Sequence, residues 1–299
     1  MTVTGATGLI GPRLVRALQE RGDEVTVLTR DPDRARRVLH DVQAFPWDLL
    51  NETAPADALA GRSAVVHLAG ANVAQRWSES AKRAIRDTRV VGTGNLIDGL
   101  RAAEPRPATL VSSSAIGYYG AHGEEPLDED AAAGNDFLAG VCVEWERQAR
   151  SAQELGMRSV QVRTGVVLDR SGGALGKMLP PFRMGVGGAV AGGRQFISWI
   201  HADDVIGIML AAIDEERWSG PVNATAPEPM SNRGFSHVLG RVLHRPAVLP
   251  VPGFAIRLLY GDMAEIVTTG ARVMPAKALV LGYTFAQPEL EPALASAIA

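Results

Sequence analysis

The sequence predicts an α/β protein that is built on a doubly wound parallel β-sheet and completed by a smaller C-terminal α/β lobe. Three features lead to this prediction. Over residues 1–168, short runs of β-branched residues alternate with longer helical patterns, which is typical of a parallel sheet with helices on both faces. A glycine-rich turn directly follows the first of these runs. Beyond residue 168 the alternation stops and glycine-rich connections begin.

Each expected strand in the first part of the chain is a short run of β-branched or apolar residues. These runs are Thr2–Thr4, Glu24–Thr29, Val42–Phe45, Ala64–Leu68, Thr109–Ser113 and Ser159–Val167. The helical patterns between them are Pro12–Arg21, Pro32–His40, Ser78–Ala103 and Asp136–Leu155. Strands and helices in this alternation fit a doubly wound sheet, so residues 1–168 are expected to form the first domain.

Residues 169–299 are expected to form the smaller lobe, with a boundary that interleaves with the first domain. The stretches "DRSGGALGKM" and "GVGGAVAGGRQ" are interpreted as loops over a ligand site. The helical patterns that follow them are Asp203–Glu216, Ser231–Leu243, Ala255–Thr269 and Pro288–Ile298. The lobe should therefore end in a helical segment.

The composition is that of an ordinary globular protein and argues against two classes of partner. The 299 residues are 46% hydrophobic and 21% charged, which is enough to build a core. With 30 basic and 33 acidic residues the net charge is -3, so the chain lacks the broad positive field that nucleic acid or an anionic membrane requires. We therefore expect a small molecule as the partner, and a homodimer is compatible with the sequence.

The sequence contains no targeting signal or metal-binding pattern. No apolar run reaches the roughly 18 to 20 residues that a bilayer span needs, and the N-terminus does not resemble a secretory signal, so we expect a cytoplasmic protein. The single cysteine, Cys142, excludes an internal disulfide and a cysteine-based zinc site, and it is expected to be buried. The 6 histidines show no ligand spacing on a common face, so no metal is expected.

The glycine turn predicts a site for a phosphorylated dinucleotide. Its glycines, Gly5, Gly8 and Gly11, follow a strand and open a helix, which is the context that this spacing needs. Glycine permits the tight turn, the approach of backbone amides to a pyrophosphate and the close packing of helix on strand. The N-terminus of the helix adds a partial positive charge. The turn residues between the glycines that we count with the site are Thr7, Leu9 and Ile10.

The end of the second strand indicates which dinucleotide binds. An acidic residue at this position usually contacts a free ribose 2′-hydroxyl, whereas arginine accommodates a 2′-phosphate. The strand "EVTVLTRD" ends in Arg30, which favours NADP(H). Asp31, followed by Pro32, is interpreted as a helix cap. The arginines that follow on the helix, 34, 36 and 37, are expected to lie mostly on a solvated face.

Several motifs together resemble the short-chain dehydrogenase/reductase superfamily in its extended branch of epimerases and dehydratases. They are "TGATGLIG", "HLAGANV", "SSSAIGYYG" and "ISWIHADDV". Longer stretches, among them "RTGVVLDRSGGALGKMLPPFRMGVGG" and "NATAPEPMSNRGFSHVL", resemble the atypical epimerase-family proteins that end in a short domain of unknown function and are also named predicted cell-division inhibitors. The resemblance implies a Rossmann-like NADP(H)-binding fold with a small C-terminal lobe over the nicotinamide end.

The resemblance also assigns roles to individual positions. It implies that Asp48 holds the adenine and that Arg163 lies near the nicotinamide end. The loop after the fourth strand, which is expected to pass along the cofactor, contains Leu68, Ala69 and Gly70. Ser114, or its neighbour Ser113, matches the active-site serine at the end of the fifth strand. The paired acids before a helix of the second lobe are Asp203 and Asp204, and we expect Asp204 and Trp199 to contact the substrate.

The chain departs from the superfamily pattern at the proton-transfer pair. Members with ordinary chemistry use Tyr-x-x-x-Lys on the helix after the serine, in which the lysine lowers the pKa of the tyrosine. If "VEWE" is aligned with the end of that helix, the tyrosine position falls on Leu138 and the lysine position on Cys142. Candidates for the missing acid are Tyr118, Tyr119 and His201.

Two hypotheses of function follow. In the first, the protein is an NADP(H)-dependent oxidoreductase or epimerase-like enzyme that acts on a small polar substrate, such as a sugar derivative. Ser114 then holds the reacting oxygen, and one of the candidate acids transfers the proton. In the second, the protein keeps the cofactor site but is a non-catalytic regulatory protein, because the Tyr-x-x-x-Lys pair is missing.

Overall fold

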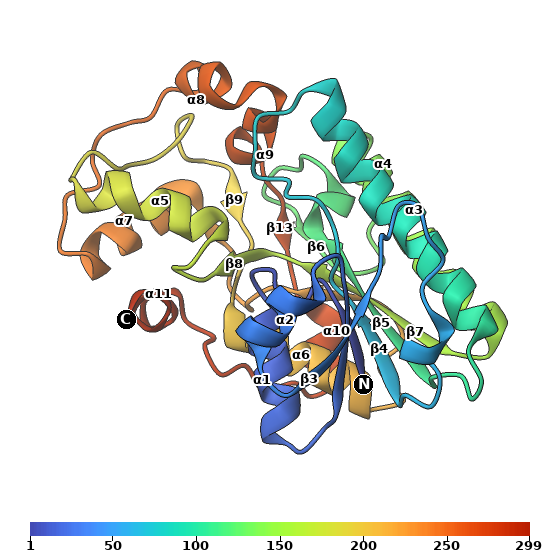
Figure 1. The fold of residues 1–299 in the computed structure, drawn as a ribbon. Coiled ribbons are helices and arrows are strands. Elements are labelled where there is room, and N and C mark those ends of the chain that lie inside the picture. Colours follow the sequence, from blue (N-terminus) through green and yellow to red (C-terminus); the bar gives the residue numbers. More distant parts are fainter.

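The computed structural model describes residues 1–299, and its centre is a seven-stranded sheet in which neighbouring strands run parallel (Figure 1). In spatial order the strands are β11 (Gly220–Ala224), β7 (Arg158–Thr164), β5 (Thr109–Ala115), β4 (Ala64–His67), β1 (Thr2–Thr4), β2 (Val25–Thr29) and β3 (Val42–Pro46). The strand order reverses between β1 and β4. In such sheets a ligand crevice opens at the carboxyl ends of the strands, at the point of reversal. The predicted doubly wound sheet is confirmed.

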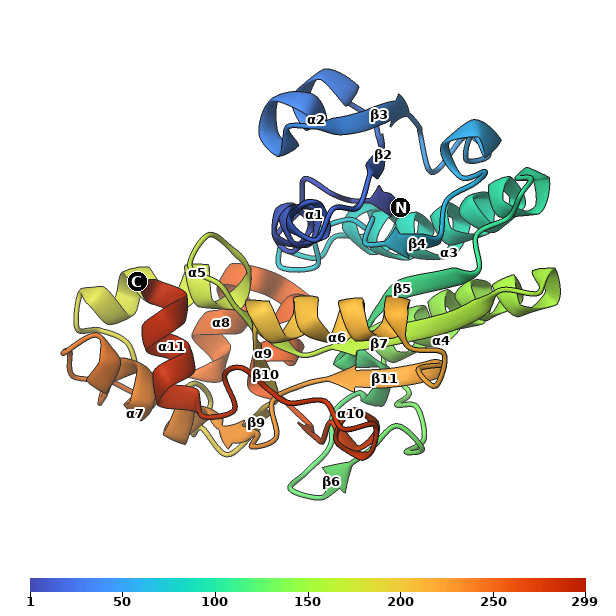
Figure 2. The same ribbon diagram turned by 90° about the horizontal axis from the view of Figure 1, so that it is seen from below.

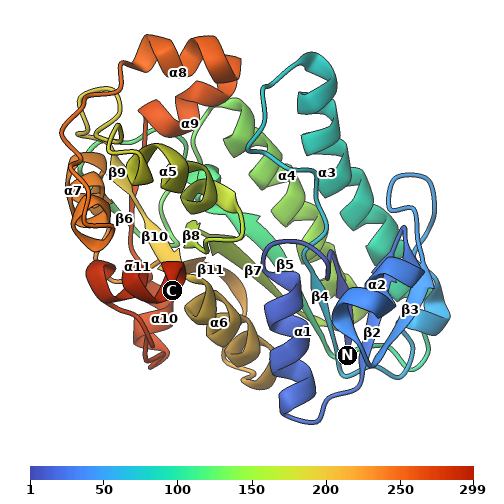
Figure 3. The same cartoon turned by 60° about the vertical axis from the view of Figure 1, so that its left-hand side comes forward.

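Helices cover both faces of the sheet. The core on one face includes buried residues of α1 (Gly11–Glu20), α2 (Pro32–Leu39) and α6 (Ala202–Asp214). The core on the other face includes buried residues of α3 (Glu79–Ala102) and α4 (Phe137–Arg150). Figure 1 shows α3 and α4 side by side, and Figure 3 shows the same for α1 and α6. None of these or the other helices combines the length and hydrophobicity of a membrane span.

A smaller lobe adds short two-stranded sheets and further helices. The strands pair as β8 (Val166–Leu168) with β10 (Trp199–His201), β9 (Phe196–Ile197) with β12 (Met230–Ser231), and β6 (Pro126–Leu127) with β13 (Arg272–Val273). The helices are α5 (Gly173–Arg183), α7 (Asn232–Val242), α8 (Gly253–Tyr260), α9 (Ala264–Thr268), α10 (Ala276–Val280) and α11 (Leu290–Ile298). Short 3-10 turns occur at η1 (Ala56–Ala58), η2 (Ile116–Tyr119), η3 (Ser151–Leu155) and η4 (Gly261–Met263). The lobe has its own apolar core around Trp199 and Phe235.

The chain returns to the central sheet after it has entered the lobe. Helix α6 lies along β7 and β11, as Figure 2 shows, and β11 pairs with β7. The sheet therefore has a strand that the alternation over residues 1–168 did not include. The sequence "GPVNA" of β11 is short and begins with glycine and proline, so it has little strand character by itself. Its pairing with β7 is a tertiary contact.

Glycine interrupts two of the predicted elements. The expected strand Ser159–Val167 divides at Gly165, where an added Cβ would overlap the carbonyl oxygen of Ser198. The expected helix Ala255–Thr269 divides at Gly261, whose φ of +62° leaves the helical region. In the opposite sense, Gly173–Arg183 forms α5 where only loops were expected. Packing of Leu175, Leu179 and Phe182 in the core of the lobe explains that helix.

A buried histidine in β4 links the stability of the sheet to pH. The Nδ1 atom of His67 lies 2.7 Å from Thr4 Oγ1, and its Nε2 atom lies 3.1 Å from Thr93 Oγ1. The side chain has no exposed surface. Burial, together with the charge of Arg89, lowers the pKa of the imidazole from 6.5 to about 4.

We predict that His67→Gln removes part of the acid sensitivity of the fold. The pKa of His67 is lower in the folded state than in the unfolded state. The stabilisation that the neutral imidazole gives to the fold is therefore complete above pH 6.5 and is lost as the pH falls towards 4. A shift of this size corresponds to about 3 kcal/mol. The free energy of unfolding, measured with urea, should fall less between neutral and mildly acid pH for the variant than for the wild type. His237→Gln, at an exposed position, should behave as the wild type, and equal losses in all three proteins would contradict the prediction.

Candidate cofactor and substrate site

Close backbone contacts require glycine at two positions of the N-terminal turn, Gly5 and Gly11. Gly5 has a φ of +66°, and an added Cβ would lie 2.7 Å from the backbone nitrogen of Ala69. An added Cβ at Gly11 would overlap the carbonyl oxygen of Ala6. The start of the turn is therefore packed against the loop that follows β4, and its two ends are packed against each other.

The same turn presents hydrogen-bond donors that the chain does not use. The backbone N–H of Gly8 donates to the carbonyl oxygen of Gly5, whereas the N–H groups of Thr7, Leu9 and Ile10 have no acceptor within the protein. These donors lie at the N-terminus of α1, where the helix dipole favours an anion. The turn is thus chemically suited to a pyrophosphate, as its sequence predicts.

Arg30, which directly follows β2, is a free cation near the loop that contains Asp48. Arg30 is exposed and makes no hydrogen bond or ion pair within the protein. Asp48, by contrast, accepts hydrogen bonds from the Asn51 side chain and the Leu50 N–H, and these bonds, with a contribution from the charge of Arg30, lower the pKa of its carboxyl. Arg36 is already paired with Asp33. Arg30 is therefore available for a phosphate, while Asp48 holds its own loop in shape.

A cavity of about 410 Å³ lies beyond the carboxyl end of β5. Its wall includes residues that follow β5 (Ala115, Ile116 and Gly117) and residues of α4 (Leu138, Val141, Cys142 and Trp145). Other wall residues come from α5, β9, α7 and the segment 265–271. The central sheet and the C-terminal lobe thus contribute to one enclosed site.

The positions of the missing proton-transfer pair lie in this cavity. Leu138 and Cys142 both line it, and a Cβ added at Gly117 would lie 3.4 Å from Leu138 and 3.9 Å from the Cys142 sulfur. Burial raises the pKa of the Cys142 thiol to about 12, so it stays protonated. Ala115 occupies the wall at the end of β5. The cavity wall contains no phenol, imidazole or amine.

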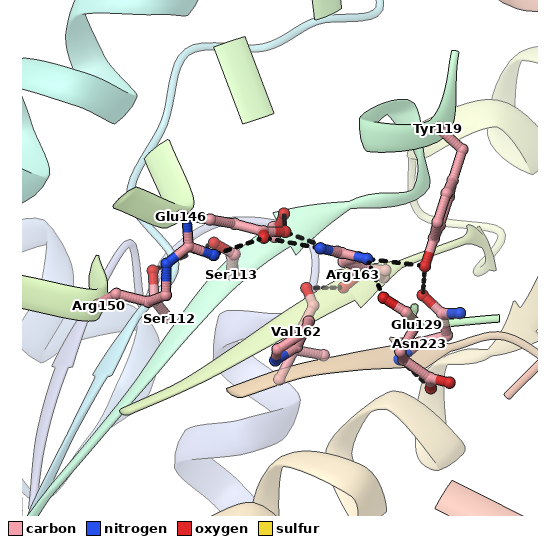
Figure 4. A network of polar contacts seen from close by, with 12 residues as sticks. Ser112, Ser113, Tyr119, Glu129, Glu146, Arg150, Val162, Arg163 and Asn223 are labelled. Atoms are coloured by element: carbon pink, nitrogen blue, oxygen red, sulfur yellow. Dashed lines mark hydrogen bonds and ion pairs between the residues drawn. The ribbon is translucent and has the colours of Figure 1, made fainter. Parts of the chain in front are cut away.

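Tyr119 and Arg163, which the sequence assigned to the site, lie instead in a buried polar network (Figure 4), and Ser114 belongs to the same network. Arg163 donates to both carboxylate oxygens of Glu146, at 2.8 and 2.9 Å, and to the Tyr119 hydroxyl at 2.9 Å. Ser114 donates to Glu146 at 2.7 Å, and Tyr119 donates to Asn223 at 2.7 Å. This network ties β5, β7, α4 and β11 together.

Electrostatics keep Arg163 charged and Tyr119 neutral. Burial disfavours the charge of Arg163, but its hydrogen bonds and attraction to Glu146 outweigh that effect and raise its pKa. Burial raises the pKa of Tyr119 to about 12, so the phenol stays neutral. The ring of Tyr118 lies 3.5 Å from the Arg163 guanidinium carbon as a cation–π partner. None of these side chains, and neither Ser113 nor Ser114, lines the cavity.

Trp199, His201 and Asp204, which were also predicted as site residues, contact other parts of the protein and do not line the cavity. Trp199 is fully buried in the core of the lobe, and its indole N–H donates to the Glu228 carbonyl oxygen. His201 caps α6 by accepting from the Asp203 N–H, and burial lowers its pKa. The carboxylate of Asp204 accepts from the Tyr283 hydroxyl and from the N–H groups at 286 and 287. It anchors the chain before α11, which explains why this acid is buried.

Arg89 is a cavity residue that the sequence reasoning missed. Its Nη1 atom donates to the carbonyl oxygens of Ala71, at 3.0 Å, and Ile85, at 3.1 Å, and its guanidinium lies 5.0 Å from the centre of the Trp145 ring. It has no carboxylate partner, and burial lowers its pKa. A Cβ added at Gly70 would lie 3.1 Å from this guanidinium. Arg89 lies four residues after the buried Ile85, and residues with this spacing share one face of a helix. The sequence could therefore have predicted Arg89 on the inner face of α3.

The parallel sheet, its two helical layers and the glycine turn define a Rossmann-like protein of the short-chain dehydrogenase/reductase superfamily. The chain belongs to the NAD dependent epimerase/dehydratase family, whose model matches residues 1–224. A domain of unknown function, DUF1731, matches residues 251–297. The family predicted from the sequence motifs is confirmed.

The chain is similar to named relatives over nearly its whole length. It is 39% identical to an Arabidopsis thaliana protein named epimerase family protein SDR39U1 homolog, chloroplastic, over 98% of this chain and 85% of that protein. A crystal structure of human epimerase family protein SDR39U1 with NADPH has 34% identity and a TM-score of 0.88, and the match covers 99% of this chain and 97% of that chain. A structure from Corynebacterium glutamicum, described as a nucleoside-diphosphate sugar epimerase, has 34% identity and a TM-score of 0.77 over 98% of this chain and 57% of that one.

We predict that Glu146→Ala destabilises the fold strongly. The change leaves the Arg163 guanidinium buried without its anion, and breaking such a pair from one side costs about 3–5 kcal/mol. Glu144→Ala on the same helix removes only an exposed pair with Arg86, worth about 0–1 kcal/mol. Chemical unfolding of both variants measures the difference, and a loss at Glu146 no greater than that at Glu144 would contradict the prediction.

Proposed function

We propose that this protein binds NADP(H) and exchanges hydride between that cofactor and a small molecule held in the cavity. The single observation that carries the proposal is the glycine turn, which leaves the N–H groups of Thr7, Leu9 and Ile10 unused, while Arg30, directly after β2, has no partner. The NADPH in the crystal structure of the human relative supports it, because that protein shares 34% identity and the whole fold. When bound, the nicotinamide would supply or accept the hydride.

Each part of the cofactor site has a proposed task. The N–H groups of Thr7, Leu9 and Ile10, with the α1 dipole, hold the pyrophosphate. Arg30 pairs with the 2′-phosphate, because its guanidinium has no other partner. The loop with Asp48 borders the adenine. The segment Leu68–Gly70, which touches Gly5, borders the cofactor on the opposite side of the turn.

The substrate end requires a different proton route from the usual one. Tyr119 donates to Asn223, His201 caps α6 and Tyr118 lies against Arg163, and none of the three lines the cavity, so they do not provide the acid. The cavity wall contains no phenol, imidazole or amine. We propose that water supplies or removes the proton at the substrate oxygen.

Arg89 is proposed as a positioning residue for the nicotinamide half of the cofactor. It is the only cationic side chain in the cavity wall, and it lies between the loop at Gly70 and α4, where Cys142 occupies the expected lysine position. A buried cation without an anion is costly, so a contact with cofactor oxygens would compensate it. The residue orients the cofactor and transfers no proton.

A regulatory function is the second candidate. The observation that favours it is the set of apolar side chains, Ala115, Leu138 and Cys142, at the place where proton transfer is expected. In that case NADPH would bind tightly, but no member of a broad panel of carbonyl compounds and alcohols would be turned over. Hydride transfer with any of them favours the enzyme.

Cellular location and self-association remain proposals that rest on the sequence. We propose a cytoplasmic protein, because no apolar run in the sequence is long enough to span a bilayer, and we propose a homodimer. Light scattering on purified protein measures its mass in solution and tests the second proposal.

We predict that Arg30→Ala weakens NADPH binding by about 1 to 3 kcal/mol, the range for losing a charge-assisted contact, and leaves NADH binding nearly unchanged. Calorimetric titration of the purified protein with both nucleotides measures this. Arg37→Ala, also exposed and without a partner, is the control and should change neither affinity. Equal losses for NADPH and NADH would show that Arg30 does not contact the 2′-phosphate.

We predict that Arg89→Met weakens NADPH binding roughly tenfold or more, because a hydrogen bond to a charged group is lost. Adenosine 2′,5′-bisphosphate, which lacks the nicotinamide half, should bind as it does to the wild type. Arg89→Lys should recover part of the loss, and Arg86→Met, at a solvent-facing ion pair on α3, should show none. Fluorescence titration gives the affinities. An equal loss for both nucleotides would place the effect in the fold and not at the nicotinamide.

A further inference from the structure

We infer that the cavity binds an uncharged, mainly apolar carbonyl compound or alcohol, such as an aromatic ketone, and not a phosphorylated or nucleotide-linked sugar. The inference rests on the proposed function, since it names the substrate class for that site. It also differs from the polar, sugar-like substrate expected from the sequence. Three properties of the wall lead to it: its side chains, the state of its polar groups and its charges.

The wall is predominantly apolar. Of its 33 residues, 22 are hydrophobic, so a ligand that enters it exchanges water for apolar contacts over most of its surface. The apolar side chains come from separate elements and surround the space: Leu138 of α4, Leu175 and Met178 of α5, Phe196 and Ile197 of β9, and Phe235 of α7. An aromatic or alicyclic ligand gains from this burial, whereas a sugar ring would lose its hydration.

Several polar side chains in the wall are already hydrogen-bonded within the protein, while the buried indole N–H of Trp145 has no acceptor. The Gln195 side-chain amide donates to the carbonyl oxygens of Val190 and Val267, both at 3.0 Å. Ser198 donates to the Ala271 carbonyl oxygen at 2.7 Å, and Asn232 accepts from the Val190 N–H at 2.8 Å. These groups fix the loops of the lobe. Several sugar hydroxyls would therefore remain unpaired in the cavity, at the cost of a lost hydrogen bond each.

The charges in the wall oppose a phosphate. Asp136 and Glu265 bring two carboxylates to it, and Arg89 is the only cation. Arg89 is held at the side of the cavity near Gly70 and Ala71 by backbone carbonyl oxygens. A diphosphate in the rest of the cavity would be desolvated near like charges without a cation to compensate.

The domain of unknown function supplies part of this wall. Residues 265–271, which run from within α9 to the start of β13, lie within the region 251–297 that the domain model matches. The same segment contributes Glu265 and the apolar Ile266 and Val267. We therefore infer that this domain has two roles: it closes the cavity, and its Glu265 carboxylate repels anionic ligands.

The test uses the full-length protein loaded with NADP⁺ and a ketone probe, acetonaphthone, so that binding is measured without hydride transfer. Acetonaphthone should bind, and UDP-glucose should neither bind nor compete with it at millimolar concentration. Met178→Glu places a charge in the cavity wall. It should weaken the binding of acetonaphthone roughly tenfold or more, because the bound probe would desolvate that charge. Met184→Glu, at a position that is 71% exposed and outside the wall, is the matched control and should bind as the wild type.

The possible results separate this inference from the proposed function. Competition by UDP-glucose, or a probe affinity that Met178→Glu leaves unchanged, would overturn the inference while NADP⁺ binding still supports the cofactor site. A protein that fails to bind NADP⁺ would overturn the proposed function. In that event the probe is titrated against the free protein, and the loss of affinity in Met178→Glu alone still decides the inference. Retained NADP⁺ affinity or an unchanged circular dichroism spectrum shows that the variants are folded.

Discussion

The buried ion pair between Arg163 and Glu146 organises the carboxyl ends of the central strands. It joins β7 to α4, and through its hydrogen bonds it also holds Ser114 on β5, Tyr119 in η2 and the carbonyl oxygen of Glu129. Such a pair is stable only when both partners keep their hydrogen bonds. Ser114 donates its hydroxyl proton to Glu146 and Tyr119 donates its own to Asn223, so both protons are engaged within this network. The cavity wall at the end of β5 is left to Ala115 and its neighbours.

The two halves of the site follow different physical rules. The cofactor half is made of backbone amides, a helix N-terminus and a free arginine, all arranged for anions. The substrate half is made of apolar side chains from elements far apart in the chain, with carboxylates near them. Arg89 lies between these halves, against both the loop after β4 and the indole of α4. This division explains how a family member can keep its nucleotide site and lose the tyrosine and lysine that commonly act beside it.

Much of the fold was predictable because its signals are local. The strand runs, the helix that follows the glycine turn and the cap at Asp31 each depend on residues close in sequence, and the structure contains these elements within a few residues of the predicted ends. The failures have non-local causes. Strand β11 exists through its pairing with β7, and α5 through the core of the lobe. Trp199 and Asp204 looked like site residues from their motif, but packing placed one in a core and used the other to anchor the C-terminal segment.

The sequence by itself determined the family, the parallel sheet and the glycine-rich turn, because glycine spacing and strand periodicity act over a few neighbouring positions. It also located the two positions, Leu138 and Cys142, where the usual proton-transfer pair is missing. Only the tertiary structure decided which side chains face the cavity. Which side chains line the cavity depends on the packing of α4 against β5 and on the position of the C-terminal segment 265–271. Burial and hydrogen bonds between elements that are far apart in the sequence leave no pattern among neighbouring residues.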